Sequence, residues 1–376
     1  MATAYPIVAT GYSQALTPLA FQPPSTLHIS KEPSQGATGS APSWITFRQD
    51  GSGIGYVTSE EEIGVVYVIR ARSDGHIDVV GRKEGYSSGG SGPVASCVVD
   101  KHLYVANYVS GSLGIVGLCG QEKDFTPTDE GVVKTVPFSR TGTGPVASRQ
   151  DHSYPHDAVA SPDGHWVYVP DLGADAIHHI RTASPAHPQP ALTHTGSTPV
   201  PAGSGPRHLA FCRDAASGVQ NAYLVNELAS TIIAYRHDAA TGQLAMLGEP
   251  LLAMPEGTPL GGDAASGPKR TIFQVLVSPD GRFVYVSDRG DEEVDHVSIF
   301  ARTPEGRIRF QAWVPSGGLG PRHMSLSADG RYLVLAHQAT GHVVVLARNT
   351  ETGHLEATGA RQAGVEHVAF AGFLPA

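Results

Sequence analysis

The sequence contains few charged residues for its length and no run of lysines or arginines. Asp, Glu, Lys and Arg make up 16% of the 376 residues, and the formal net charge at pH 7 is -9. Proteins that bind nucleic acids depend on clustered cations that neutralise backbone phosphates. An acidic chain without such a cluster is predicted to have no nucleic-acid partner.

Long apolar stretches are also missing. No segment approaches the roughly 18 uninterrupted apolar residues that a membrane-spanning helix requires. The first residues, MATAYPIVATGYSQALTPLAF, lack the basic start and the compact apolar centre of a signal peptide. We therefore expect a cytoplasmic protein that makes no membrane contact.

Cysteine is scarce. Cys97, Cys119 and Cys212 lie far apart in the sequence, which fits neither a disulfide framework nor the ligand spacing of a zinc site. We expect three reduced thiols, which agrees with a cytoplasmic location.

Glycine and proline, in contrast, are abundant, and the chain repeats itself. The 44 glycines and 28 prolines indicate many tight turns and few long helices. The strings SPDGHWVYV (161–169), SPDGRFVYV (278–286) and SADGRYLVL (327–335) recur, with a degenerate copy in VVDKHLYV (98–105). Each combines a turn with an alternating apolar strand, and this pattern is typical of a β-hairpin.

A second set of turns follows the first. It reads ARSDGHI (71–77), HDAATGQL (237–244), ARTPEGRI (301–308) and ARNTETGHL (347–355). These turns join two further strands, so one repeat holds four. The first strand of successive repeats begins near Pro42, Pro93, Pro155, Pro206, Ile272 and Pro321. A spacing of about 50 to 65 residues is typical of the blades of a β-propeller.

These six repeats leave one strand near the C-terminus and three near the N-terminus without partners. The C-terminal VEHVAFAGFL (365–374) reads as a seventh first strand, and YPIVATGY, ALTPLAFQ and STLHIS near the N-terminus can supply its partners. Such closure covers both free sheet edges. We predict an all-β, seven-bladed β-propeller of four-stranded blades, forming a single domain over residues 1–376. Six blades with a strapped-on tail are the alternative.

Strand direction alternates within a blade, so each kind of loop lies on a fixed face. The loops leading into each first strand share one face with the loops between second and third strands; we call this the lead-in face. The SPDG-type and TGHL-type turns lie on the opposite face. Ionisable and polar residues gather on the lead-in face: Asn107, Tyr108, His156, Asp171, Arg207, His208, Glu227, Arg289, Arg322, His323, His337, Glu366 and His367.

Three arginines near one axis suggest an anionic ligand. Burying Arg207, Arg289 and Arg322 without a counter-charge is costly, and guanidinium groups bind carboxylates and phosphates well. Glu227 and His156 can exchange protons beside them. We therefore expect a small carboxylate or phosphate substrate.

The other candidate substrate-binding residues are Asn107, Tyr108, Asp171, Arg322 and His337. Asp171 equally fits a turn cap. His208 and His323 follow channel-facing arginines, so alternation predicts that they face the next blade and are structural.

Motifs of other chemistries are missing. There is no glycine-rich phosphate loop, no G-x-S-x-G nucleophile elbow and no His/Cys cluster at zinc spacing. Propeller lactonases that use calcium need a cage of carboxylates and Asn, whereas the axis candidates here are mostly basic. We predict neither a metal ion nor a cofactor.

Taken together, these motifs resemble one family. The passages RQDHSYPHDAVASPDGHWVYVPDLGADAI, GSGPRHLAF, VSPDGRFVYVSDRG and GPRHMSLSADGRYLVLAHQ are similar to seven-bladed lactonase-type propellers, and the likeness covers essentially the whole chain. This family includes bacterial 6-phosphogluconolactonase-like proteins and the fungal carboxy-cis,cis-muconate cyclase. The segment APSWITFRQDGSGIGYVTSEEE resembles the fungal branch.

The resemblance implies a site and a reaction. The positions proposed for catalysis in the fungal cyclase match His156, Arg207, Glu227 and Arg289. The reaction would be a metal-free and cofactor-free cycloisomerisation, in which a substrate carboxylate adds across a conjugated double bond and closes a γ-lactone. Both arginines would stabilise the developing charge, and His156 or Glu227 would deliver the proton.

Our first hypothesis is thus a cyclase acting on a small unsaturated polycarboxylate. The alternatives are a lactone hydrolase of the 6-phosphogluconolactonase type, a non-catalytic binding propeller and a cyclase of secondary metabolism. In the hydrolase the arginines would hold a phosphate, and His156 or Glu227 would activate water. Ala95 stands where many lactonase relatives carry a histidine, which counts against a phosphosugar substrate. The loops 182–204 and 254–270 could cover the site, and the oligomeric state is left open.

Overall fold

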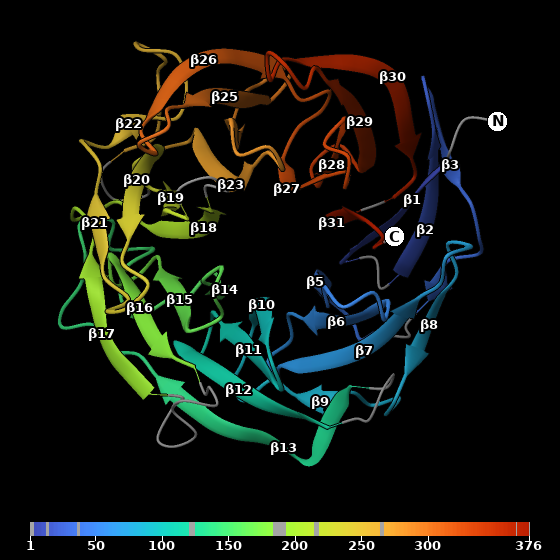
Figure 1. The fold of residues 1–376 in the computed structure, drawn as a ribbon, viewed down its shortest axis with the longest axis horizontal. Coiled ribbons are helices and arrows are strands. Elements are labelled where there is room, and N and C mark those ends of the chain that lie inside the picture. The colour runs from blue at the N-terminus through green and yellow to red at the C-terminus, as the bar shows by residue number, and fades with distance from the viewer. Residues whose placement is uncertain are drawn as a thin grey trace.

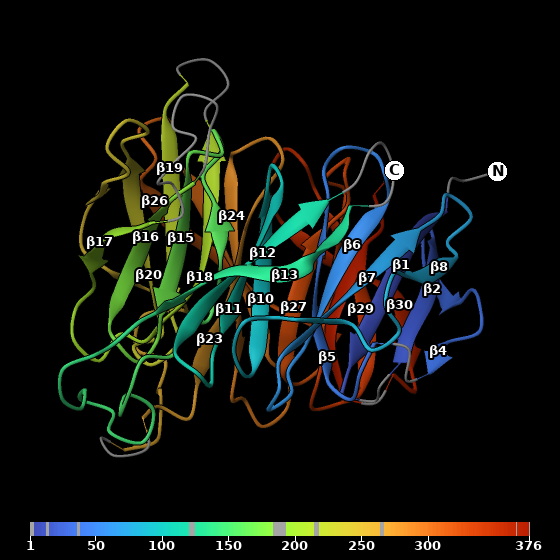
Figure 2. The same ribbon diagram turned by 90° about the horizontal axis from the view of Figure 1, so that it is seen from below.

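The fold is a ring of seven β-sheets around a central axis (Figure 1). The computed structural model describes residues 4–12, 15–35, 38–119, 125–182, 193–213, 218–263, 267–365 and 367–375. All regular elements within these ranges are β-strands, and the described residues include no helix able to cross a membrane. Figure 2 shows the ring edge-on, with the strands running between its two faces.

The first four blades follow one another along the chain, and each is antiparallel. Blade 1 consists of β5 (Pro42–Phe47), β6 (Ile54–Ser59), β7 (Val65–Ala71), β8 (Ile77–Val80) and the short β9 (Tyr86–Ser87). Blade 2 consists of β10 (Pro93–Val99), β11 (His102–Asn107), β12 (Ser112–Cys119) and β13 (Thr126–Pro137). Blade 3 consists of β14 (Val159–Ala160), β15 (Trp166–Asp171), β16 (Ala176–Arg181) and β17 (Thr193–Pro199). Blade 4 consists of β18 (Pro206–Arg213), β19 (Gln220–Asn226), β20 (Thr231–His237), β21 (Leu244–Met246) and β22 (Leu251–Leu252).

Three more blades complete the ring. Blade 5 consists of β23 (Thr271–Val277), β24 (Phe283–Arg289), β25 (His296–Arg302) and β26 (Ile308–Pro315). Blade 6 consists of β27 (Pro321–Leu326), β28 (Tyr332–His337), β29 (His342–Arg348) and β30 (Leu355–Ala363). Blade 7 consists of β31 (Val368–Phe373), β1 (Tyr5–Gly11), β2 (Ala15–Gln22), β3 (Thr26–Ile29) and the short β4 (Ser34–Gln35).

Blade 7 joins the two ends of the chain. Its strand order is β3-β2-β1-β31, and Ile7 in β1 lies opposite Phe373 in β31. The N- and C-terminal strands therefore lie side by side, as Figure 1 shows. The predicted seven-bladed closure is confirmed, and the six-bladed alternative is wrong.

Neighbouring blades are joined by a repeated tyrosine contact. Tyr168 and Tyr223 lie in the second strands of blades 3 and 4 and are fully buried. Their hydroxyls donate to the carbonyls of Gly242 and Gly306, which lie in turns of the next blade, at 2.7 and 2.9 Å. At Gly242 a Cβ would come within 2.6 Å of the Trp166 ring, and φ is +73°. The TG turns seen in the sequence thus serve blade packing, because only glycine tolerates both constraints.

A β-bulge near the start of β18 brings two adjacent side chains to the axis. The register of β18 against β19 shifts between Pro206 and His208, and Arg207 lies at this irregularity. Bulges break the alternation of side chains and redirect them. His208 stacks on Trp44 of blade 1, across the ring, with centroids 5.4 Å apart and planes at 12°. The prediction that His208 faces the next blade is wrong for this reason.

The same irregularity occurs in β27, between Pro321 and His323. His323 also contacts the Trp44 ring, edge-to-face at 5.0 Å, and Phe370 of β31 lies 5.9 Å from that ring. These three residues and His208 form an aromatic layer across the axis. The prediction that His323 faces the next blade is likewise wrong.

Candidate active site

The candidate site is built around one buried carboxylate. Glu227 follows β19, and its Oε2 accepts a hydrogen bond from Nε of Arg207 at 2.8 Å. Its Oε1 accepts from a terminal nitrogen of Arg149 at 3.0 Å and from one of Arg289 at 3.3 Å. Arg149 lies in the loop before blade 3, Arg207 in blade 4 and Arg289 in blade 5. Segments far apart in sequence thus place three guanidinium groups on one acid.

Phe273 of β23 fixes the spacing of two of these cations. The guanidinium carbons of Arg207 and Arg289 both lie over its ring, at 4.3 and 3.9 Å from the ring centroid. Arg207 also donates to the Phe273 carbonyl at 2.8 Å, and Arg289 donates to the Thr271 hydroxyl at 2.9 Å. Such cation–π contacts hold the two charges in place when they are removed from water.

Exposure divides the cluster into two layers. The Arg207 and Glu227 side chains are 3% and 2% exposed, so they form a buried base. Those of Arg149 and Arg289 are 33% and 35% exposed. Ligands can therefore reach the outer two arginines, while the inner pair holds them in position.

Arg322 lies in a second, smaller group. A terminal nitrogen of Arg322 is 3.3 Å from Oε2 of Glu60, which also accepts a hydrogen bond from the Tyr12 hydroxyl. The Arg322 guanidinium lies over the Tyr12 ring at 5.4 Å. Blades 1, 6 and 7 thus meet here. The Arg322 side chain is 18% exposed, so a ligand reaches it less easily than Arg149 or Arg289.

The cluster carries an excess of positive charge. Four guanidinium groups face two carboxylates, Glu227 and Glu60. Burial alone would raise the pKa of Glu227, but Arg207, Arg149 and Arg289 together lower it to about 2. Burial lowers the pKa of Arg207 to about 10, so this group remains cationic at neutral pH. An anion bound here would balance the excess.

His156 lies beside this cluster as a neutral imidazole. Burial, followed by the charges of Arg207 and the nearby His208 and Arg322, holds the pKa of His156 well below its usual value. The Tyr108 ring packs edge-to-face on His156, with centroids 5.2 Å apart. Nδ1 of His156 is buried and has no hydrogen-bond partner among the described residues. The His156 ring is therefore unprotonated at neutral pH, and it can accept a proton but cannot donate one as an imidazolium.

Tyr108 also borders the cluster. Its hydroxyl interacts with Arg149, and burial raises the pKa of this hydroxyl despite that cation. Of the predicted substrate-binding residues, Tyr108 and Arg322 therefore lie at the site, together with His156, Arg207, Glu227 and Arg289.

Asn107, Asp171 and His337 do not lie in this cluster. Each is fully buried and engaged by its own surroundings. Asn107 exchanges hydrogen bonds with Ser88, at 2.7 Å and 3.2 Å. Nε2 of His337 contacts the Ser316 hydroxyl at 3.0 Å. Their role as substrate ligands stays a prediction, and the structure places each of them in contact with protein groups outside the arginine cluster.

Asp171 makes the contacts of a turn cap, which is the structural alternative for this residue. Its carboxylate accepts from the backbone amides of Tyr154 and Ala174 at 2.7 and 2.9 Å, and from Ser153. Nε2 of His178 lies 3.0 Å away. No acceptor on this carboxylate is left for a ligand. Glu366 lies outside the described residues.

Sequence reasoning missed Arg149, Glu60 and Tyr12. Arg149 lies in an insertion without a repeat position, and Tyr12 and Glu60 follow β1 and β6. The only available signal was that Glu60 occupies a second-to-third strand loop, as Glu227 does. Among the described residues, no group of three His, Cys, Asp or Glu side chains is arranged to hold a metal ion.

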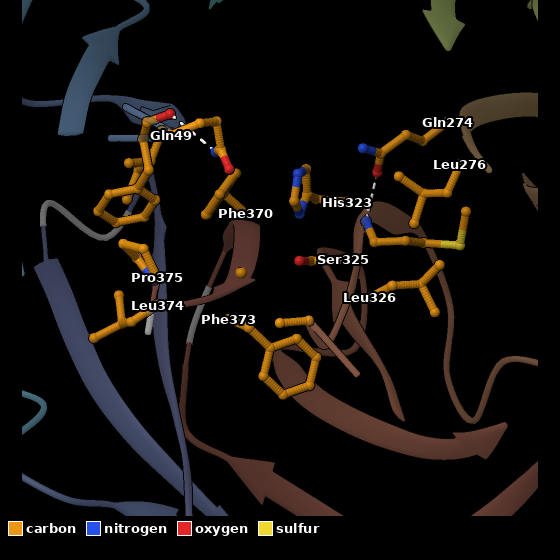
Figure 3. A pocket seen from close by; sticks show the side chains of 15 residues that line it. Gln49, Gln274, Leu276, His323, Ser325, Leu326, Phe370, Phe373, Leu374 and Pro375 are labelled. Atoms are coloured by element: carbon orange, nitrogen blue, oxygen red, sulfur yellow. Dashed lines mark hydrogen bonds between the residues drawn. The ribbon is translucent and has the colours of Figure 1, made fainter. Parts of the chain in front are cut away.

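A separate cavity of about 370 Å³ lies away from the arginines. It is lined by residues of the first strands, including Leu276 and Leu326, and by His323 and Phe370 of the aromatic layer (Figure 3). No charged side chain lines it. The charge that would hold an anion is therefore found on the lead-in face, and we place the candidate active site there.

Comparison with known proteins agrees with this architecture. Residues 7–371 match the family described as "Lactonase, 7-bladed beta-propeller". A 6-phosphogluconolactonase of Bacillus subtilis is 27% identical, over 80% of this chain and 81% of the relative. One of Formosa agariphila is 29% identical, over 68% of this chain and 66% of the relative. The chain belongs to the lactonase family of seven-bladed β-propellers.

Solved structures show the same fold along the whole chain. The periplasmic gluconolactonase of Pseudomonas aeruginosa has a TM-score of 0.81 at 25% identity, covering 99% of both chains. A putative 6-phosphogluconolactonase of Bacteroides uniformis has a TM-score of 0.81 at 26% identity, covering 98% of both chains.

Proposed function

We propose that the protein hydrolyses an anionic sugar lactone of the 6-phosphogluconolactone type. The observation that carries this proposal is the cationic cluster, in which Arg149, Arg207 and Arg289 share the single carboxylate of Glu227. The names of the relatives support the same reaction class, since curated relatives are called 6-phosphogluconolactonase.

The substrate phosphate binds at the two outer arginines. Arg149 and Arg289 each keep about a third of their side chain exposed. A guanidinium presents paired N–H donors that match phosphate oxygens. Glu227 fixes both groups through one oxygen atom, so the clamp exists before the substrate arrives. Less ordering is then needed on binding.

Hydrolysis needs stabilisation of negative charge and a proton acceptor. Water adds to the lactone carbonyl and charge develops on its oxygen, which nearby guanidinium groups stabilise. A neutral imidazole beside the cations suits the removal of the water proton. Glu227 is a poor acceptor, because its pKa of about 2 leaves little proton affinity.

The cyclisation predicted from the sequence stays a prediction, with less support. Its four residues His156, Arg207, Glu227 and Arg289 do lie around one site, but a cyclase must deliver a proton. Glu227 is ionised and His156 is neutral at neutral pH. Neither group holds the proton that this reaction requires. Ala95 in place of a histidine is weaker evidence against a phosphosugar substrate than it is from the sequence alone. The reason is that Arg149 adds a cation to the site.

The proposal is tested by direct assay of the purified protein. Hydrolysis of 6-phosphoglucono-δ-lactone is followed by proton release, with the spontaneous rate subtracted. Loss of the diene absorbance of 3-carboxy-cis,cis-muconate is followed in parallel. We expect acceleration of the first reaction only. Acceleration of the second alone would establish the cyclase, and tight binding without turnover of either would establish a binding propeller.

A further inference from the structure

His208 of the aromatic layer is paired with an aspartate, and this pair has no role in the reaction as described so far. Nδ1 of His208 lies 2.9 Å from Oδ2 of Asp157, and both side chains are about 95% buried, with 5% and 6% exposure. Asp157 belongs to the lead-in of blade 3 and His208 to β18 of blade 4. The pair therefore bridges two blades at the ring axis.

Asp157 fixes the tautomer of His208. An ionised carboxylate only accepts hydrogen bonds, so Nδ1 of His208 must carry the hydrogen. Oδ2 of Asp157 also accepts from the Leu209 amide at 3.3 Å, and Oδ1 accepts from the Ala158 amide at 2.8 Å. These two backbone amides thus hold the Asp157 carboxylate in position. Nε2 of His208 is left with a lone pair, and no described residue donates to it.

The surroundings place the His208 ring next to the cationic cluster. The His208 ring stacks on Trp44 and meets the His156 ring edge-on, with centroids 5.3 Å apart. Arg207 precedes it in the chain, and the charges of Arg207 and Arg322 both act on its ring. By contrast, no contact sets the tautomer of His156 through its buried Nδ1. Of the two neutral histidines, His208 is the oriented one.

A second copy of the motif serves as an internal comparison. Gly-Pro-Arg-His occurs in blades 4 and 6, and His323 occupies the equivalent place. Nδ1 of His323 donates to the backbone carbonyl of Ala371 at 2.9 Å instead of to a carboxylate. The fold therefore accommodates this histidine without a buried acid. A buried charge costs stability unless it is well paired, so the acid beside His208 points to a chemical role.

We infer that His208, oriented by Asp157, is the proton acceptor of the lactone hydrolysis proposed above. As the water oxygen bonds to the carbonyl carbon, the water proton passes to Nε2 of His208. The imidazolium then returns this proton to the ring oxygen as the bond between that oxygen and the carbonyl carbon breaks. The product is a hydroxy acid, which ionises in solution. The Asp157 carboxylate, which accepts the hydrogen on Nδ1, stabilises the imidazolium.

The inference rests on the proposed function, and three variants test it. His208→Gln removes the acceptor, Asp157→Asn keeps the shape but removes the charge, and His323→Gln is the matched control. We expect His208→Gln to lower kcat on 6-phosphoglucono-δ-lactone by about 100-fold or more, with KM changed less than about threefold. Asp157→Asn should lower kcat by at least about tenfold, and His323→Gln by less than about threefold.

A spectroscopic readout separates this inference from the proposed function. Nitrogen NMR of His208 reports the tautomer without any substrate; we expect hydrogen on Nδ1 in the wild type and its partial loss in Asp157→Asn. Hydrogen on Nε2, or kcat unchanged in His208→Gln, would overturn the inference. If His208→Gln and His323→Gln lowered kcat equally and lowered Tm equally, the His208–Asp157 pair would have only a structural role. A wild type inactive on the lactone would overturn the proposed function and the base role together.

Discussion

Arg149 and Arg289 donate to the same oxygen atom of Glu227, at 3.0 and 3.3 Å. The two arginines come from the lead-in of blade 3 and the end of β24 in blade 5. Like charges come this close only because the carboxylate lies between them and because one of them also rests on Phe273. In the proposed function this arrangement is a clamp for the anionic group of the substrate.

Removal of the central charge should weaken both the fold and the site. Glu227→Gln leaves Arg207, which is 3% exposed, without its counter-ion. Breaking a buried ion pair from one side costs about 3 to 5 kcal/mol. We expect a loss of that order in the free energy of unfolding, measured by urea denaturation, and an increase in KM. An unchanged free energy of unfolding would show that water hydrates the Arg207 guanidinium, or that another group neutralises it, in the variant.

Arg149 should set the preference for a phosphorylated substrate. Arg149→Ala removes one outer guanidinium, and a lost charge-assisted hydrogen bond of about 1.5 to 3 kcal/mol corresponds to a rise in KM of roughly 10- to 100-fold. The KM for unphosphorylated glucono-δ-lactone should change little. Arg282→Ala is the control, since Arg282 lies in an SPDG-type turn on the opposite face. Equal effects on both lactones would place Arg149 outside the phosphate site.

Phe273 should act through the arginines. Phe273→Leu keeps an apolar side chain but removes the ring that Arg207 and Arg289 both contact. Cation–π contacts away from water contribute about 2 kcal/mol. We therefore expect kcat/KM for the phosphorylated lactone to fall by at least about tenfold, and a much smaller change in Tm than for Glu227→Gln. Kinetics indistinguishable from the wild type would contradict this role.

The pH dependence should follow the histidines and not Glu227. Burial lowers the pKa of His208 and of His156 from the ordinary value of 6.5. A depressed pKa means that the neutral, proton-accepting form persists below that value. Log kcat/KM should stay flat on going from pH 8 to about pH 6.5 and fall only in more acidic solution. A decline that begins above pH 6.5 would indicate a different base.

The folded ring could be predicted largely from the sequence. The SPDG and TG turns mark hairpins at a regular spacing, and strand alternation then determines which loops share a face. His156, Arg207, Glu227 and Arg289 were placed together by that argument, and the structure brings them to one site. Short-range patterns of this kind can be recognised in a single sequence because they recur in successive repeats.

The features that could not be predicted lie where the backbone departs from the regular repeat. The bulge after Pro206 turns His208 toward Trp44, although strict alternation sends it the other way. Arg149 belongs to an insertion that has no counterpart in other repeats, so no periodicity marks it. The contacts of Asn107 could not be predicted either, because a loop position near the axis does not reveal that Ser88 exchanges hydrogen bonds with its amide.

The central claim is that the cationic cluster selects an anionic lactone. The most direct test is the ratio of kcat/KM for 6-phosphoglucono-δ-lactone to that for glucono-δ-lactone, measured with the wild-type protein at neutral pH. Two guanidinium contacts to the phosphate predict a ratio of about 100 or more. A ratio near one, with measurable turnover of both lactones, would contradict the account.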